Sequence, residues 1–269
     1  MLGLRLASLG GAAFWLLGLI STATPVPTIA TDAADIDNAT WFARWTSVLE
    51  RHVDGAGRID FAELRDNHDE LDRVVGFIAA VDPASRPDRF PTHEDKLAYY
   101  INAYNALAMY GVLKAGVPDS LGGLRKIGFF YLRTFTVGGR SISLYDLEND
   151  VIRPMGDSRI HFALNCMVVS CPRLPRHAFT PGEMDRQLDE ATREFVADSR
   201  NVRVDPERRD VWLSAIFDFY TKDFLAAAKS LVDYVNRYRT EKVPDGFEVR
   251  FSDYDWTVNA QTRGRTQAQ

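Results

Sequence analysis

The sequence has few of the features that would place it in a specialised class. Its 269 residues include only two cysteines, and its formal net charge at pH 7 is −5. It has no internal repeat and no run of basic residues, so its charge pattern does not favour nucleic acid or an anionic membrane as a partner. The 46% hydrophobic and 12% aromatic content is typical of a packed core rather than of disorder.

Long hydrophobic runs are also scarce, and the one that stands out lies near the N-terminus. Arg5 precedes an apolar run at residues 6–20, and small-x-small patterns follow at 21–23 and 28–30. This order predicts a signal peptide over residues 1–23, with cleavage after residue 23 or residue 30. Because the run is shorter than the roughly 20 residues that span a bilayer, an uncleaved anchor is only the alternative. We expect an exported chain, periplasmic or extracellular, with no stable membrane span after cleavage.

The remaining chain has the length of one large domain. Residues 24–40, rich in Pro, Ala and Thr, predict a flexible leader. Residues 41–259 are expected to form a single globular domain, and residues 260–269 a disordered tail.

Hydrophobic periodicity and capping signals predict helices interspersed with short strands. Helices are expected at residues 41–52, 92–114 and 144–153, after Thr180 through Phe195, and at 214–239 with a break near Phe224. Capping boxes are expected at Thr92 and Thr180, and Ser143 is expected to cap the helix at 144–153. Strands are expected at residues 129–137, 140–142, 160–166, 202–204, 211–213 and 247–251. We therefore predict an α+β fold, in which the buried central helix at residues 92–114 packs on a mostly antiparallel, hairpin-linked sheet.

Several motifs resemble one known family. Tyr-Ile-Asn-Ala-Tyr-Asn-Ala-Leu at residues 100–107 and His-Phe-Ala-Leu-Asn-Cys at 161–166, with Ser-Cys-Pro at 170–172, resemble the family catalogued as domain of unknown function 547. Further stretches that fit the likeness lie at residues 147–153, 215–224 and 254–256. The likeness covers about residues 41–259. It implies a shared fold but no established reaction.

His161, Cys166 and Cys171 form the segment with the clearest chemical potential. One interpretation is a thiol nucleophile with His161 as its base, a pairing that makes a thiolate available at neutral pH. On a straight strand His161 and Cys166 point to opposite faces, whereas a turn after Cys166 would bring Cys171 back beside His161. Cys171 is therefore the better candidate nucleophile, and Arg173 and Arg176 would favour its thiolate.

Two other interpretations of this segment stay open. The first is a local disulfide between Cys166 and Cys171, or two buried cysteines beside a hydrogen-bonded histidine, which the oxidising environment of an exported chain favours. The second is a His-Cys-Cys metal site. A calcium loop ending at residues 57–63 is rejected, because only one of three early ligand positions carries a carboxylate. We expect no cofactor.

Asn102 and Asn105 lie one turn apart on one face of the central helix. A buried amide is costly unless it is hydrogen-bonded, so this pair either braces the fold or, with Tyr104, lines a polar pocket. The order of central helix, His161 and Asp255 loosely resembles papain-like and transglutaminase-like enzymes. In that layout Asn102 stands where such an enzyme carries its thiol.

Three charged residues have alternative roles. Glu148 and Arg153, just before the predicted His161 strand, either orient His161 or pair with each other. Asp255 is either a turn residue or an orienter of His161.

Two classes of function follow from these residues. The main expectation is an exported envelope protein that binds a small molecule or an envelope protein in a polar pocket. The pocket residues would be Asn105, Tyr104, Glu148, Arg153, Cys166 and Asp255. The alternative is a thiol-dependent hydrolase or transferase with Cys171 as nucleophile, His161 as base and Asn102 as a third catalytic residue.

Overall fold

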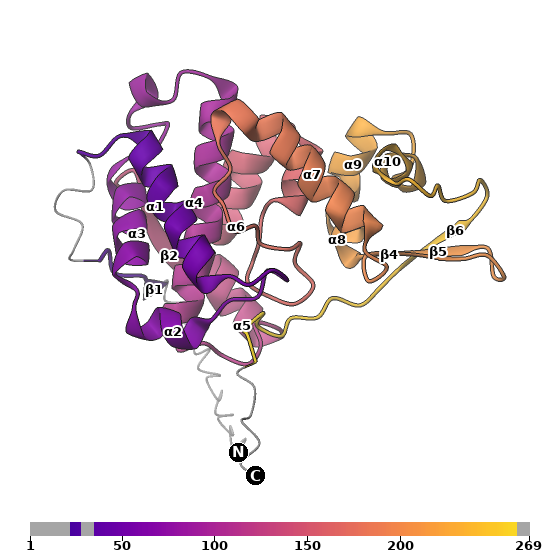
Figure 1. Ribbon diagram of the computed structural model, residues 1–269, viewed down its shortest axis with the longest axis horizontal. Helices are drawn as coiled ribbons and strands as arrows, with labels where there is room; N and C mark the ends of the chain where they lie inside the picture. Colours follow the sequence, from indigo (N-terminus) through magenta and orange to yellow (C-terminus); the bar gives the residue numbers. More distant parts are fainter. Residues whose placement is uncertain (1–21, 28–34, 263–269) are drawn as a thin grey trace, which may run out of the picture.

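Helices supply most of the structure, and two small sheets accompany them (Figure 1). The structure, a computed structural model, describes residues 22–27 and 35–262. Its longer helices are α1 (Asn38–His52), α2 (Phe61–Asp66), α3 (Asp69–Ala80), α4 (His93–Lys114), α7 (Met184–Ala197), α9 (Thr221–Ala227) and α10 (Leu231–Tyr238). Shorter helices are α5 (Leu124–Lys126), α6 (Leu144–Asp146) and α8 (Ala215–Phe219). The predicted α+β class is confirmed.

The central helix α4 begins at a capping box and is buried along most of its length. The Thr92 hydroxyl accepts a hydrogen bond from the Asp95 N–H, and the Asp95 carboxylate accepts one from the Thr92 N–H, each at 3.0 Å. Every residue from 97 to 113 is buried. A helix that is apolar around its circumference is stable only when it is enclosed, as α4 is here.

Aromatic side chains join α4 to the helices beside it. Trp41 on α1 stacks on Phe77 of α3 with ring centroids 5.1 Å apart, and its indole N–H donates to the Val74 carbonyl at 3.2 Å. Tyr99 on α4 donates its hydroxyl to the Val81 carbonyl at 2.7 Å. These hydrogen bonds allow large rings to be buried without an unsatisfied polar tip.

The first sheet has the order β1-β2-β3, with β1 (Thr22–Ala23), β2 (Arg133–Val137) and β3 (Arg140–Ser143). Strands β2 and β3 form the predicted hairpin, which turns at Gly138 and Gly139 with φ of 55° and 79°. A Cβ at Gly138 would lie 2.1 Å from Asp82 Oδ1, so only glycine fits there. Strand β1 pairs in parallel with β2 and is formed by the last two residues of the predicted signal peptide.

The second sheet has the order β4-β5-β6 and lies with α7 to α10 at the other end of the molecule (Figure 1). Strands β4 (Val202–Asp205) and β5 (Asp210–Leu213) form the predicted hairpin, and β6 (Glu248–Phe251) pairs in parallel with β5. Each sheet thus combines one antiparallel and one parallel pair, where the sequence predicted one mostly antiparallel sheet.

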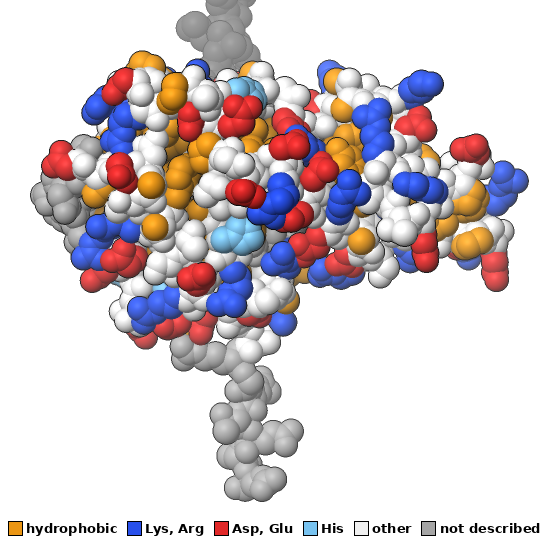
Figure 2. All heavy atoms as spheres, turned by 45° about the horizontal axis from the view of Figure 1, so that its top comes forward, with side chains coloured by type: hydrophobic (Ala, Val, Ile, Leu, Met, Phe, Trp, Pro, Cys, Tyr) orange, Lys and Arg blue, Asp and Glu red, His pale blue; other side chains and the backbone are white. Residues whose placement is uncertain are grey.

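The surface carries both signs of charge. On the face shown in Figure 2, basic and acidic side chains lie next to one another rather than in separate patches. On α7, for example, Arg186 pairs with Glu183 and Glu190, each at 2.5 Å. Within residues 22–27 and 35–262, no helix has the length and apolar character that a membrane crossing requires.

The predicted strand at residues 160–166 is wrong. Residues Ser158–Phe162 form a short 3-10 helix (η6), and the chain from residue 163 to 172 is irregular. The Asp157 carboxylate accepts from the Arg159 N–H at 2.9 Å and so starts the helical turn. The alternation of apolar residues there reflects burial between α4 and α7, not pairing in a sheet.

Three further segments differ from their predictions. The expected helix at residues 214–239 is divided into α8, α9 and α10. The first half of the expected strand at residues 129–137 is a π-helix, η3 (Ile127–Leu132). The expected helix at residues 144–153 is divided into α6, a second π-helix η4 (Leu147–Ile152) and a 3-10 turn η5 (Arg153–Met155). π-Helical turns are rare in proteins, and many of those that occur lie at functional sites.

Two other predicted features also differ from the structure, one before α7 and one near the C-terminus. Thr180 makes no side-chain cap, and a 3-10 turn η7 (Pro181–Glu183) precedes α7. Ala260 and Gln261, which the sequence placed in the disordered tail, are among the described residues, and Gln261 donates hydrogen bonds to the carbonyls of Ile59, His52 and Arg58. The predicted signal run at residues 6–20 lies outside the described residues.

Candidate functional site

A cavity of about 350 Å³ is lined by residues of α4, η3, η4, η6 and α8 and by the irregular segments at residues 164–172 and 254–256. Both π-helices contribute to its wall, η3 through Tyr131 and η4 through Glu148. Aromatic rings make up much of the lining: Tyr104, Phe130, Tyr131, Tyr145, Phe219, Tyr220, Tyr254 and Trp256. The polar groups that face it are those of Lys126, Glu148, Asn149, Arg153, His161, Cys166 and Cys171. A mainly aromatic cavity with a few convergent polar groups is the usual form of a ligand site.

His161 pairs with Asp223, a carboxylate that had no role predicted from the sequence. Its Nε2 lies 2.8 Å from Asp223 Oδ2, and Arg153 binds the same carboxylate through Nε at 2.8 Å and Nη2 at 2.9 Å. The hydrogen bond from His161, followed by that from Arg153, lowers the pKa of Asp223 well below its usual range. His161 Nδ1 is buried and has no hydrogen-bond partner among the described residues.

Stacking fixes the plane of the His161 ring. The ring lies on Tyr220 with centroids 3.8 Å apart and an interplanar angle of 16°. The Arg153 guanidinium lies over the same tyrosine at 5.2 Å. The histidine is therefore fixed on one face and at one nitrogen.

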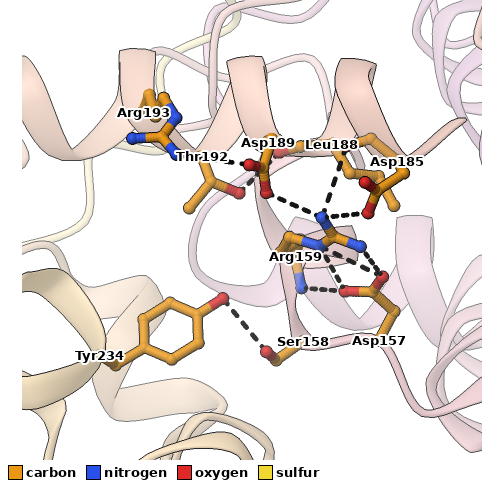
Figure 3. Close-up of polar contacts among 9 residues, drawn as sticks. All are labelled: Asp157, Ser158, Arg159, Asp185, Leu188, Asp189, Thr192, Arg193 and Tyr234. Carbon is orange, nitrogen blue, oxygen red and sulfur yellow. Dashed lines mark hydrogen bonds and ion pairs between the residues drawn. The ribbon is translucent and has the colours of Figure 1, made fainter. Parts of the chain in front are cut away.

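An ion-pair cluster anchors the turn that carries His161 (Figure 3). Arg159 on η6 binds Asp157 on its own turn at 2.7 Å, and Asp185 and Asp189 of α7 at 2.8 Å each. Ser158 contacts the hydroxyl of Tyr234 of α10 at 3.1 Å. Since several charges converge on one half-buried guanidinium, this network holds η6 more firmly than an isolated surface pair would.

The two cysteines lie together as free thiols, their sulfurs 2.6 Å apart. A disulfide bond is about 2.05 Å long, so the predicted disulfide is not present in this structure. Cys171 Sγ accepts the Cys166 N–H at 3.1 Å and lies 3.4 Å from the Tyr254 hydroxyl.

The environment makes the two thiols unequal. Burial alone raises the pKa of Cys171, but hydrogen bonds from Cys166, Tyr254 and the backbone outweigh it and leave that pKa below its usual value. The hydrogen bond with Cys171, followed by burial, raises the pKa of Cys166. Burial also raises the pKa of Tyr254, which keeps its hydroxyl protonated and able to donate.

The loop between the cysteines is closed by Asn165. Its Oδ1 accepts from the Met167 N–H at 2.7 Å, and its Nδ2 donates to the Pro172 carbonyl at 2.6 Å. Met167 has a φ of 65°, a left-handed conformation that is uncommon for a residue with a side chain. This turn returns the chain so that Cys171 meets Cys166.

The two candidate asparagines on α4 both bind backbone, in different places. Asn105 donates to the Ala163 carbonyl at 2.9 Å and accepts the Asn165 N–H at 2.7 Å, so it braces the segment beside the cysteines. Asn102 donates to and accepts from the backbone of Phe179, at 2.7 and 3.0 Å. Neither lines the cavity.

Glu148 and Arg153 do not pair with each other. Glu148 is buried and accepts the Tyr104 hydroxyl at 3.1 Å, whereas Arg153 binds Asp223. Asp255 is exposed and accepts the Thr257 N–H at 2.9 Å, which is the turn role. The acid on His161 is Asp223 instead.

Three residues that contact His161 or the cysteines had no role assigned from the sequence: Tyr220, Asp223 and Tyr254. The same is true of Lys126 and of several aromatic residues of the cavity wall. Asp223 and Tyr254 do stand in stretches that carry the family resemblance, and this was the available signal. In the part of the chain that the structure describes, no group of three or more His, Cys, Asp or Glu side chains could hold a metal ion. The His-Cys-Cys site is therefore not formed.

Together these features define an α+β protein with an aromatic cavity that contains a pair of thiols and a histidine–aspartate pair. Residues 88–196 match the family described as "Protein of unknown function, DUF547", which confirms the resemblance over that segment. No curated protein and no solved structure matches the chain. The matched segment holds His161 and both cysteines, while Asp223 and Tyr254 lie beyond it.

Proposed function

We propose that the aromatic cavity binds a small organic anion and that the Cys171 thiolate reacts with it. The observation that carries the proposal is the position of Cys171 Sγ, which lines the cavity within hydrogen-bonding distance of the Cys166 N–H and the Tyr254 hydroxyl. Donors directed at a thiol stabilise its charged, nucleophilic form.

The lining supports an anion with an apolar or aromatic body. Ring faces offer stacking and large apolar area to such a body. Lys126 Nζ lies 4.5 Å from the Trp256 ring centroid and 5.6 Å from that of Phe219, at the cavity wall. Its charge is thus held beside the rings, where it can meet a carboxylate of the ligand.

The contacts of Cys171 favour Tyr254 over His161 as the group that activates it. The hydrogen-bonding neighbours of its sulfur are Cys166 and Tyr254, whereas His161 is bonded to Asp223. A hydrolase or transferase that uses His161 as base is the second candidate. The shared cavity and the partnerless Nδ1 of His161 are the observations that favour it.

Alkylation kinetics test the proposal directly. At pH 7 we expect Cys171 of the folded protein to react with iodoacetamide several-fold faster than the same residue in the unfolded chain, because the hydrogen bonds that lower its pKa raise the fraction of thiolate. Tyr254→Phe keeps the ring but removes the hydroxyl donor. We expect this variant to lose most of the rate advantage that the folded chain has over the unfolded chain. A Cys171 that reacts no faster folded than unfolded would overturn the proposal.

The matched control separates ligand recognition from thiol activation. Lys126→Met keeps a long side chain over the rings but removes its charge. We expect it to slow the anionic reagent iodoacetate and to leave the neutral reagent iodoacetamide unchanged. Equal slowing of both reagents would remove Lys126 from the anion-binding role.

We also propose that the chain is exported to the periplasm or the extracellular space. The apolar run at residues 6–20 and the small residues after it support this. Expression in a bacterial host followed by mass measurement of the exported fraction tests it. We expect a mature N-terminus at Thr24 or Thr31; a full-length chain retained with the cells would contradict export.

A further inference from the structure

We propose that Cys166 and Cys171 act together as a dithiol that exchanges with the disulfide bond of a small organic disulfide bound in the aromatic cavity. This inference rests on the proposed function, since it takes Cys171 as the reactive thiol. It adds the substrate class and gives Cys166 a chemical role.

The fold holds the two sulfurs where such an exchange needs them. They lie 2.6 Å apart and both line the cavity. The left-handed Met167 and the two hydrogen bonds of Asn165 fix the loop that joins them. Asn105 attaches this loop to α4 through the Asn165 N–H. The second thiol therefore has little distance to travel to reach Cys171.

Access distinguishes the attacking thiol from the resolving thiol. Cys171 and Pro172 line both this cavity and a second cavity of about 710 Å³, whereas Cys166 lines the first alone. Cys171 thus borders open space on two sides, which leaves room for the released half of a substrate to depart. The unequal acidity of the pair agrees with this order, because the thiol with the lower pKa is the better attacker at neutral pH.

The reaction balances without a metal or cofactor. The Cys171 thiolate attacks one sulfur of the substrate disulfide, which forms a mixed disulfide and releases the other half as a thiolate that takes up a proton. Cys166 then gives its proton to solvent and attacks Cys171 Sγ. The internal disulfide forms and the second half leaves as a thiol. The substrate is reduced to two thiols and the chain is oxidised; an external small thiol or dithiol reduces it again.

A second thiol at this position favours exchange over acyl transfer. An acyl–Cys171 intermediate would need a base that activates water, and the groups in contact with Cys171 are a thiol and a phenol. A mixed disulfide needs a neighbouring thiol, and Cys166 supplies it.

The test uses dithiobis(nitrobenzoate), an aromatic carboxylate disulfide whose released thiol is coloured. For the reduced full chain with one equivalent of reagent, we expect two coloured thiols per chain, and a protein mass lowered by two hydrogens with no adduct. Cys166→Ser should stop at the mixed disulfide, with one coloured thiol and one retained adduct. Cys171→Ser should slow the first release at least about tenfold.

The outcomes separate the two proposals. Stable adducts on the wild-type chain, together with fast alkylation of Cys171, would overturn the dithiol inference and leave the proposed function standing. Slow reaction of Cys171 with both the alkylating reagent and the disulfide would overturn both. Equilibration with mixtures of reduced and oxidised glutathione gives an independent readout: an internal disulfide should form in the wild type, and a chain that yields only glutathione adducts would contradict the inference.

Discussion

Helix α4 and the segment from η6 to Pro172 are both buried, yet they satisfy their backbone in opposite ways. In α4 the backbone groups bond to one another along the helix, and only the ends need a cap. In the other segment, part of the backbone depends on side chains: Asn105 of α4 binds the backbone at residues 163 and 165, and Asn165 binds the Met167 N–H and the Pro172 carbonyl. The backbone hydrogen bonds of α4 do not depend on any one side chain, whereas the irregular segment loses backbone partners when one of these asparagines is removed.

This difference also explains where the site lies. Irregular backbone can direct two thiols, a histidine and a phenol toward one cavity, because its side chains do not follow the fixed angular spacing of a helix or strand. The cost is dependence on a few buried amides. Substitutions of those amides are therefore the sharpest way to test the contrast between the two regions.

The largest effect is expected from the asparagines on α4. Asn105→Ala leaves the Ala163 carbonyl and the Asn165 N–H without a partner, and Asn102→Ala does the same at Phe179. Both side chains are 1% exposed, so each substitution should lower the free energy of unfolding by about 3 kcal/mol. Urea denaturation measures this loss.

The two variants should differ in thiol chemistry. Asn105 holds the loop that carries the cysteines, so Asn105→Ala should slow alkylation of Cys171 in the folded protein several-fold. Asn102 holds Phe179 and serves as the control, with an unchanged rate. If Cys171 is alkylated at the same rate in both variants, Asn105 does not position the thiols. The proposed difference between α4 and the irregular segment would then not extend to the thiol chemistry.

The same contrast decided what could be predicted from the sequence. The capping box at Thr92, the burial of α4 and the hairpin turn at Gly138 each have a signal within a few neighbouring residues of sequence, and all were predicted. The alternation at residues 160–166 was taken for a strand because it has the same period. Nothing local distinguishes a strand from an irregular segment enclosed between two helices.

The partners of the site were harder to predict for a related reason. Asp223 reaches His161 across 62 positions of sequence, and Tyr254 reaches Cys171 across 83. Asp255, the residue beside Tyr254, was proposed for the role of Asp223 but turns outward. A sequence indicates which residue types are available, whereas the packing of α8 and α9 against η6 selects the residue that makes contact.

A smaller effect is expected at Asp223. His161 and Arg153 hold its pKa below the value of about 3.9 for an unfolded chain, so the network stabilises the fold fully above about pH 4 and less as the pH falls below it. Asp223→Asn should lower the free energy of unfolding by about 2 kcal/mol at pH 7. The gap between variant and wild type should narrow below pH 4, which denaturation at several pH values measures.

Asp255→Asn is the matched control for this carboxylate. Asp255 is exposed, and its contact with the Thr257 N–H survives in the amide, so the free energy of unfolding of the variant should stay within about 0.5 kcal/mol of wild type.

The alkylation rate of Cys171 tests the role of Asp223 in a second way. Asp223→Asn should leave the Cys171 rate within about twofold, because Tyr254 is the proposed donor; a tenfold loss would favour His161 as the base instead.

The smallest effect concerns two threonines that look alike in the sequence. Thr92 and Thr180 each precede an acidic residue by three positions, but only Thr92 accepts the N–H of that residue. Thr92→Ala should therefore cost about 1 kcal/mol in the free energy of unfolding, and Thr180→Ala less than half of that. Neither should change the alkylation rate of Cys171. Equal losses for the two variants would mean that the Thr180 side chain does cap the following helical turn. The start of α7 would then depend on a local capping residue, as the start of α4 does.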